Sequence, residues 1–354
     1  MTSTRKSRRA ASVVASLALL SVSALVLGAC TSPSATTTSA AATTSSTPTA
    51  TATPTPVATY IAPLTGEVVS APITTPALSS KIDNLADARP QYGLELTDLV
   101  FEELVEGGIT RYVAVWNSQI PKKYGPVRSI RGMDPAIVSP LGGIITYSGG
   151  QQVFIDGIEA TDVVNVSDDV YGGDSSLFYR TSAKVAPHNL LAKGQNIVEK
   201  FGDDLDPPAQ QWDYAADAAS SSAATEGTAT KRIRATFSTY AAPLWTWDAA
   251  SGTWLRFQTS GEEDVDSNGD QLSAVNVVTL RVTLKTISHT PVSQLVGTGK
   301  ATISTGGYTV EGTYEKDSLT DSIHLYDAAG EPIELAPGNT WFELVATGGS
   351  VTIK

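Results

Sequence analysis

Residues 97–117 read TDLVFEELVEGGITRYVAVWN, and this stretch decides the fold of the N-terminal half. Gly107–Gly108 separates two apolar runs, and the second run alternates β-branched and aromatic residues. A Gly-Gly pair between two such runs predicts a tight β-hairpin. Residues 98–106 also fit a helix that Thr97 would cap and Gly107 would end. We prefer the strand, and the sequence leaves the helix open as the alternative.

The hairpin determines which side chains share a face of the sheet. We expect Val105 to lie opposite Thr110, and directly opposed residues point to the same side. Arg111 is then expected to take part in an internal charge network. One face carries Glu103 and Tyr112, and the other carries Glu102, Glu106 and Arg111.

Strands and helices alternate through the rest of residues 60–214. Asp134-Pro135 is typical of a helix start, and Gly143–Tyr147 is typical of a buried strand. Helices are expected over 150–160 and 189–201. We therefore predict an α+β fold class, with a mixed α/β N-terminal domain over residues 60–214.

Residues 231–354 are predicted to be nearly all strand. Val278–Lys285 alternates apolar and polar residues with period two, as a half-buried antiparallel strand requires. Residues 215–230 are small and polar without periodicity, which predicts a linker or long loop. We expect a mainly antiparallel β C-terminal domain over 231–354, as an open sheet or a sandwich. Further short strands are expected at 232–239, 245–247, 254–258, 300–304, 308–314, 322–326 and 340–345.

The N-terminus has the pattern of an export signal. Four basic residues precede an apolar stretch over residues 10–28, which predicts a signal peptide over residues 1–29. The run Leu27-Gly28-Ala29-Cys30 resembles a bacterial lipobox, so Cys30 is the predicted lipidation site. A transmembrane anchor is the alternative. Residues 30–59 are rich in Thr, Ser, Ala and Pro, which predicts a disordered stalk.

Composition excludes several classes of function. The formal net charge is -12, and such an acidic chain is a poor partner for nucleic acid. Cys30 is the only cysteine, so thiolate metal sites and cysteine nucleophiles are excluded elsewhere. Asp264–Asp270 looks like half of a calcium loop, but Val275 stands where the twelfth-position acid belongs. We predict an acidic turn there, no metal site and no cofactor.

Several polar residues of the N-terminal domain are candidates for a site. Arg128 and Arg131 could grip an anion or pair internally, and the sequence favours neither. His188 could carry a proton or serve only as a hydrogen-bonding partner. Asn189 suits the N-cap of the expected helix. Trp245, Trp247 and Trp254 are expected on one face of a sheet, as core residues rather than a sugar platform.

Several motifs in the same order resemble the YerB family of bacterial lipoproteins. They are Lys81-Ile82-Asp83-Asn84, Ala88–Leu94, Thr97–Val100, Glu106–Arg111, Gly125–Arg131, Ala186–Leu190 and Pro337–Trp341. The resemblance implies an N-terminal and a C-terminal domain of unknown function and no assigned reaction. It also marks a candidate ligand-binding set. This set comprises Asp83, Asn84, Arg89, Glu106, Arg111, Arg128, Arg131, His188 and Asn189.

Together these features predict a lipoprotein on the outer face of the cytoplasmic membrane. We expect a non-catalytic binding or scaffold protein of the cell envelope, with an Arg/Asp/His-lined groove in its N-terminal domain. Its expected partners are the membrane, through the lipid, and a cell-wall ligand or an envelope protein. The alternative is a cell-wall hydrolase that uses paired carboxylates and His188. A purely structural module is a third hypothesis.

Overall fold

The computed structural model describes residues 59–354. The predicted signal peptide, the lipidation of Cys30 and the stalk up to residue 58 lie outside the described residues. Within residues 59–354, none of the helices combines the length and the apolar character needed to cross a membrane.

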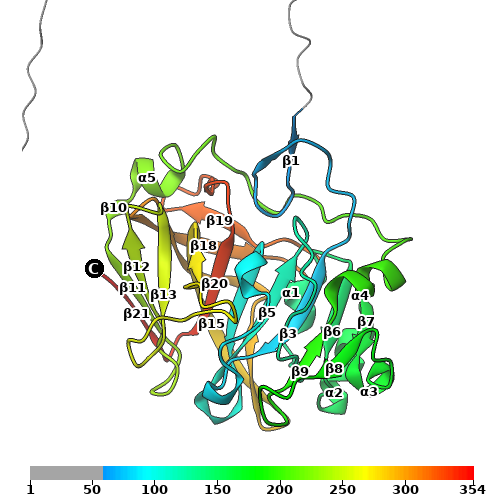
Figure 1. The fold of residues 1–354 in the computed structure, drawn as a ribbon. Helices are drawn as coiled ribbons and strands as arrows, with labels where there is room; N and C mark the ends of the chain where they lie inside the picture. Colours follow the sequence, from blue (N-terminus) through cyan, green and yellow to red (C-terminus); the bar gives the residue numbers. More distant parts are fainter. Residues whose placement is uncertain (1–58) are drawn as a thin grey trace, which may run out of the picture. The chain divides into compact units, whose positions relative to one another are not determined.

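Strands from both halves of the sequence form one 12-stranded mixed sheet (Figure 1). Its path is β10-β18-β17-β15-β20-β4-β5-β3-β6-β7, with β16 paired to β15 and β19 paired to β18. The N-terminal strands are β3 (Leu78–Asp83), β4 (Leu99–Leu104), β5 (Thr110–Trp116), β6 (Ile144–Tyr147) and β7 (Val164–Ser167). The C-terminal strands are β10 (Thr228–Ala229), β15 (Asn276–Ile287), β16 (Thr290–Gln294), β17 (Gly297–Thr305), β18 (Tyr308–Lys316), β19 (His324–Asp327) and β20 (Thr340–Ala346).

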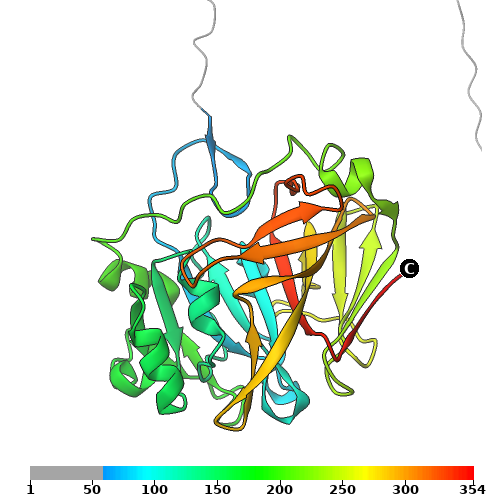
Figure 2. The ribbon, with the colours of Figure 1, turned by 180° about the vertical axis from the view of Figure 1, so that it is seen from behind.

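The two halves of the sheet meet where β20 pairs with β4 in parallel. Phe342 lies directly opposite Phe101 across this joint. Their rings stack with centroids 4.7 Å apart, and both side chains are buried. Residues more than two hundred positions apart in the sequence therefore form one continuous core. Figure 2 shows the C-terminal strands from the other side.

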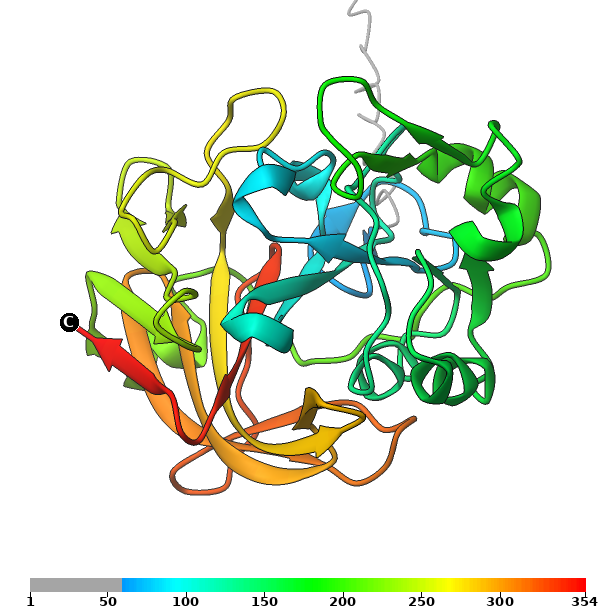
Figure 3. The same cartoon turned by 90° about the horizontal axis from the view of Figure 1, so that it is seen from below.

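A second, five-stranded sheet packs on one face of the first. Its order is β14-β13-β12-β11-β21. Trp245 and Trp254 from this sheet lie in one hydrophobic cluster with Tyr112 and Trp341 of the large sheet, which confirms that these tryptophans are core residues. The view in Figure 3 separates this sheet from the helices. Its strands are β11 (Arg232–Thr236), β12 (Leu244–Asp248), β13 (Thr253–Phe257), β14 (Ser273–Ala274) and β21 (Ser350–Ile353).

The helices are short. In the described residues the α-helices are α1 (Asp134–Val138), α2 (Gln152–Glu159), α3 (Asp168–Tyr171), α4 (Gly194–Phe201) and α5 (Ser222–Glu226). The 3-10 helices are η1 (Ala86–Ala88), η2 (Leu94–Leu96) and η3 (Glu106–Gly108). Two separate strand pairs complete the fold, β1 (Tyr60–Ile61) with β2 (Val68–Val69) and β8 (Phe178–Arg180) with β9 (Leu190–Ala192).

The predicted α+β class, with a mixed α/β N-terminal domain, is wrong. The part of the chain that the structure describes is mostly β, with 40% strand and 13% helix. The alternation of strands and helices in the sequence overstated the helices, because those of the N-terminal half are connections of four to eight residues around a continuous sheet. The C-terminal strands were found close to their predicted positions, but β20 runs parallel to both of its neighbours.

Two local predictions also need correction. The helix expected over 189–201 begins only at Gly194, because Leu190–Ala192 pairs as β9, and Asn189 therefore caps no helix. The segment 215–230, expected to be a linker or loop, contains α5 and β10. Its Thr228 and Ala229 pair with β18. The small residues of this segment allow its backbone to approach the sheet closely. They do not indicate a linker that is free of the fold.

The β4–β5 hairpin is confirmed, but its expected register is wrong. Leu104, not Val105, lies opposite Thr110. The turn is longer than a two-residue loop, because η3 includes Gly107 and Gly108 at φ 73° and 75° and Val105 N bonds to Ile109 O. A slip of one residue exchanges the faces of the sheet. Glu102 therefore shares a face with Tyr112, and Glu103 shares the other with Arg111.

The stacked pair at the joint gives a test of this architecture. Phe342→Ala should lower the free energy of unfolding by about 3–5 kcal/mol, since it leaves a cavity where the halves meet. Urea denaturation of the full chain followed by circular dichroism measures the change. Val170→Ala, at a side chain that is 72% exposed, is the control and should shift it by no more than about 0.5 kcal/mol. Equal effects of the two changes would contradict a shared core.

Candidate functional site

A buried ion-pair network lies between the two sheets. Arg256 on β13 is fully buried and bonds through Nη2 to Glu102 Oε2 on β4. Its Nη1 donates to Asp264 Oδ2 at 2.6 Å. The guanidinium carbon lies 5.0 Å from the ring centroid of Trp341 and 5.5 Å from that of Trp245. The network therefore joins the N-terminal hairpin to the C-terminal sheet through an arginine surrounded by aromatic rings.

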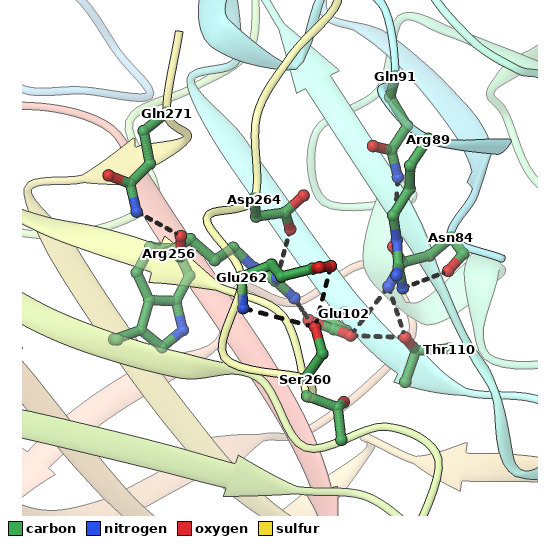
Figure 4. Close-up of polar contacts among 12 residues, drawn as sticks. Asn84, Arg89, Gln91, Glu102, Thr110, Arg256, Ser260, Glu262, Asp264 and Gln271 are labelled. Carbon is green, nitrogen blue, oxygen red and sulfur yellow. Dashed lines mark hydrogen bonds and ion pairs between the residues drawn. The ribbon is translucent and has the colours of Figure 1, made fainter. Parts of the chain in front are cut away.

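The network continues from Glu102 toward the surface (Figure 4). Thr110 Oγ1 donates to Glu102 Oε1 at 2.5 Å, and Asn84 Nδ2 donates to Thr110 Oγ1 at 2.8 Å. Arg89 Nε donates to Asn84 Oδ1 at 3.1 Å, and its Nη2 donates to Asn84 O at 2.7 Å. Gln91 Nε2 donates to the same Asn84 Oδ1 at 3.2 Å. Asn84 Nδ2 also donates to Glu102 Oε1 at 3.3 Å, so four side chains hold Asn84, which in turn positions Arg89.

A cavity of about 270 Å³ opens beside this network. Arg89 lines it on one side, and Tyr240, a ring that is 75% exposed, lines it on another. Gln258 also lines the cavity, and its buried Nε2 has no hydrogen-bond partner. The cavity therefore offers one charged donor, one unused amide donor and one aromatic face. We refer to it as the Arg89 cavity.

The two arginines that line the cavity differ in whether their charge is free to bind a ligand. Burial opposes the charge of Arg256, but the nearby Glu102 and Asp264 carboxylates keep its pKa well above the ordinary value. Burial, together with the charge of Glu102, raises the pKa of Glu343 well above its usual range. Arg256 therefore carries a positive charge, and the Glu102 and Asp264 carboxylates already balance that charge. Arg89 is instead bound by the neutral groups of Asn84, which leaves its charge available.

A second polar cluster occupies the opposite face of the β3–β5–β4 strands. Asp83 Oδ2 lies 2.7 Å from His188 Nδ1 and 3.1 Å from Arg128 Nε. Arg111 lies opposite Asp83 and donates to Ser129 O at 2.7 Å. Burial and the charges of the neighbouring Arg131 and Arg128 lower the pKa of Arg111 to about 10.

Glu106 and Arg131 extend this cluster at the hairpin turn. Arg131 Nε donates to Glu106 Oε2 at 2.9 Å, and Thr290 Oγ1 donates to Glu106 Oε1 at 2.7 Å. Partial burial acts to raise the pKa of Glu106, but its hydrogen bonds and the charge of Arg131 outweigh this effect and lower the pKa. The pair with Glu106 is one of the internal pairings that the sequence left open for Arg131.

The predicted site residues therefore divide between three places. Asn84 and Arg89 line the cavity, and Asn189 lies elsewhere, bonded to Arg180 at 3.0 Å. Their role in binding a ligand stays a prediction. The other six, Asp83, Glu106, Arg111, Arg128, Arg131 and His188, form the cluster on the opposite face.

Sequence reasoning missed the C-terminal contribution to the cavity. Arg256, Gln258 and Tyr240 carry no motif, and only their placement by the sheet brings them to Asn84. Asp264 belongs to the stretch that looked like a calcium loop, and it binds Arg256 instead. Between residues 59 and 354, no group of three or more His, Cys, Asp or Glu side chains is arranged to hold a metal ion.

The fold and the cavity define a class of protein in which two segments share one large sheet and together line one cavity. Residues 64–206 match the protein of unknown function (DUF3048) N-terminal domain. Residues 233–342 match the DUF3048 C-terminal domain. The chain belongs to the DUF3048 family, which confirms the family resemblance seen in the sequence motifs.

YerB of Bacillus subtilis (strain 168) is similar in sequence and in fold. The chain is 36% identical to the protein described as "Putative lipoprotein YerB" over 131 residues, which is 36% of this chain and 38% of that relative's length. The crystal structure of YerB matches with a TM-score of 0.71 at 21% identity, covering 83% of this chain and 99% of the YerB chain. This likeness in structure shows that the fold is shared.

Loss of the buried arginine tests the network. Arg256→Met should destabilise the protein by about 3–5 kcal/mol, because Glu102 and Asp264 would stay buried without their cation. Lys200→Met is the control, since it removes an exposed ion pair with Asp174 and should cost no more than about 1 kcal/mol. Chemical denaturation of both variants gives the two values. If Arg256→Met changed the free energy of unfolding by less than about 1 kcal/mol, the network would not be what stabilises the packing of the two sheets.

Proposed function

We propose that this protein is an exported, lipid-anchored binding protein of the cell envelope, and that its ligand occupies the Arg89 cavity. The lipobox-like sequence at Cys30 and the similarity to a relative described as a lipoprotein support the anchor. The observation that carries the binding function is the cavity itself. It holds an arginine with an available charge, a donor without a partner and an exposed aromatic ring.

The lining of the cavity favours an acidic ligand with an apolar or sugar face. Arg89 would pair with a carboxylate, the Gln258 amide would donate to a second oxygen, and the Tyr240 ring would stack on the ligand. The volume of about 270 Å³ lies slightly below that of a drug-sized site. A short acidic segment therefore fits, and a peptidoglycan-derived glycopeptide combines these features.

The Arg/Asp/His cluster enters this proposal as a positioning element. Asp83 and Asn84 are consecutive, so the contacts of Asp83 with Arg128 and His188 hold the end of β3 that presents Asn84 to the cavity. The carboxylates available for hydrolysis are already engaged. Asp83 is buried in contact with Arg128 and His188, and hydrogen bonds lower the pKa of Glu106. Both features support binding rather than acid catalysis.

The anchor can be tested by changing one residue. Cys30→Ala should move the protein from the membrane pellet to the soluble fraction or leave it as the longer, uncleaved precursor, because the lipid would have no attachment site. Membrane fractionation with immunoblotting and the mass of the N-terminal peptide give the answer. Ser34→Ala in the same stretch is the control and should stay in the membrane. A Cys30→Ala protein that is processed and sediments like the wild type would refute the anchor.

The cavity can be tested with soluble muropeptides as the probe. The full chain in detergent should bind them, and Arg89→Ala and Tyr240→Ala should each weaken binding about 10-fold, which corresponds to about 1.4 kcal/mol. Isothermal titration calorimetry measures the affinities. Lys200→Ala is the control, since Lys200 is an exposed cation on α4 and does not line the cavity. Absence of binding by the wild type, or equal affinities of all variants, would refute the cavity as the site.

A further inference from the structure

Three fully buried charged residues meet on the face of the sheet opposite the Arg89 cavity. Lys81 lies on β3, Glu103 on β4 and Asp134 at the start of α1, and all three are 0% exposed. Lys81 Nζ donates to Asp134 Oδ1 at 2.7 Å and contacts Glu103 Oε1. Neither the cavity nor the proposed binding function uses this triad.

The two carboxylates of the triad have different surroundings. Asp134 is fully engaged, because its Oδ1 accepts from Lys81 and its Oδ2 accepts from Arg131 N at 2.6 Å. Glu103 contacts Lys81 Nζ through Oε1, but its buried Oε2 has no hydrogen-bond partner. A buried carboxylate oxygen without a partner is costly. A reaction that consumes the Glu103 carboxylate would remove this cost.

The surroundings of Lys81 suit an amine nucleophile. Burial, helped by the nearby Arg111 and Arg131 charges, lowers the pKa of Lys81 to about 8 against the opposing effect of Asp134. A lysine that can lose its proton in a buried site is a reactive nucleophile. Arg111 lies directly opposite Glu103 on the same face, and its buried Nε has no hydrogen-bond partner. A cationic donor therefore stands beside the carboxyl group.

We propose that Lys81 and Glu103 join in an intramolecular isopeptide bond. Asp134 relays one proton from the Lys81 ammonium to the Glu103 carboxylate, and the free Nζ attacks Cδ of the carboxyl group so protonated. Arg111 stabilises the oxyanion that forms. The attacking nitrogen gives a second proton to Asp134, which passes it to the leaving hydroxyl as the C–O bond breaks, and one water is released. The ammonium and the carboxylate become a neutral amide and water, and nothing is oxidised or reduced.

The bond would close a covalent bridge over the central strand of the N-terminal half. β5 lies between β3 and β4, with Val113 opposite Lys81 and Arg111 opposite Glu103. The amide would therefore tie both neighbours of β5 to each other. Cys30 is the only cysteine of the chain, so a disulfide cannot supply an internal cross-link. An isopeptide bond is a cross-link that this sequence can form.

Mass spectrometry of the full chain purified from membranes tests the proposal without any substitution. The protein should be lighter than its sequence and lipid require by the mass of one water molecule. Trypsin should not cleave after Lys81, and it does not cleave Arg89–Pro90. The segment that precedes Lys81 should therefore remain joined to residues 82–111, and fragmentation should place the link at Glu103. An unmodified mass with complete cleavage at Lys81 would overturn the proposal. A link to Asp134 instead, which would carry residues 132–180, would also overturn it.

Variants distinguish a covalent Lys81–Glu103 bond from a triad that is held by ion pairs alone. Lys81→Met and Glu103→Ala should abolish the mass deficit, and Asp134→Asn should slow its appearance while leaving the protein folded by circular dichroism. In Glu103→Gln the same attack would release ammonia instead of water, so the deficit should become the mass of one ammonia. Lys200→Met is the matched control and should keep the full deficit. A deficit that persists in Lys81→Met would place the lost water elsewhere and refute the Lys81–Glu103 bond.

Discussion

Two consecutive glutamates on a strand that is buried on both faces constrain the rest of the structure. β4 lies between β5 and β20, and Glu102 and Glu103 are 1% and 0% exposed. Neighbouring residues of a strand point to opposite faces, so two carboxylates are buried in two different environments. Each costs several kcal/mol unless a cation accompanies it. Arg256 from the C-terminal half meets the first, and Lys81 from β3 contacts the second.

This constraint explains why the halves are not independent. Glu102 has its cation only when β13 packs on the hairpin, and the β4–β20 joint aligns the strands that make this contact. The aromatic rings around Arg256 exclude water from the ion pair, which strengthens it. Thr110 and Asn84 then use the remaining oxygen of Glu102. The Arg89 cavity therefore lies where the polar network reaches the surface.

The local features of the fold could be predicted from the sequence, and the long-range ones could not. Gly107–Gly108 and the alternating runs identify the hairpin, and the tryptophan spacing identifies a core face. The register depends on the 3-10 turn at Glu106, which makes the loop longer than the glycines alone indicate. Arg256 carries no motif because its partner Glu102 is 154 positions away in the sequence. The motifs did find Asn84 and Arg89, whose contacts are local.

The two buried networks share a strand, so the rigidity of one determines the geometry of the other. Glu102 forms part of the cavity wall, and the residue that follows it contacts Lys81 on the opposite face. Whatever fixes Glu103 relative to β3 also fixes Glu102, and through it Thr110 and Asn84. A binding site whose donors are held before the ligand arrives loses less conformational entropy on binding. In this protein the side chains that stabilise the core are therefore also those that pre-organise Arg89.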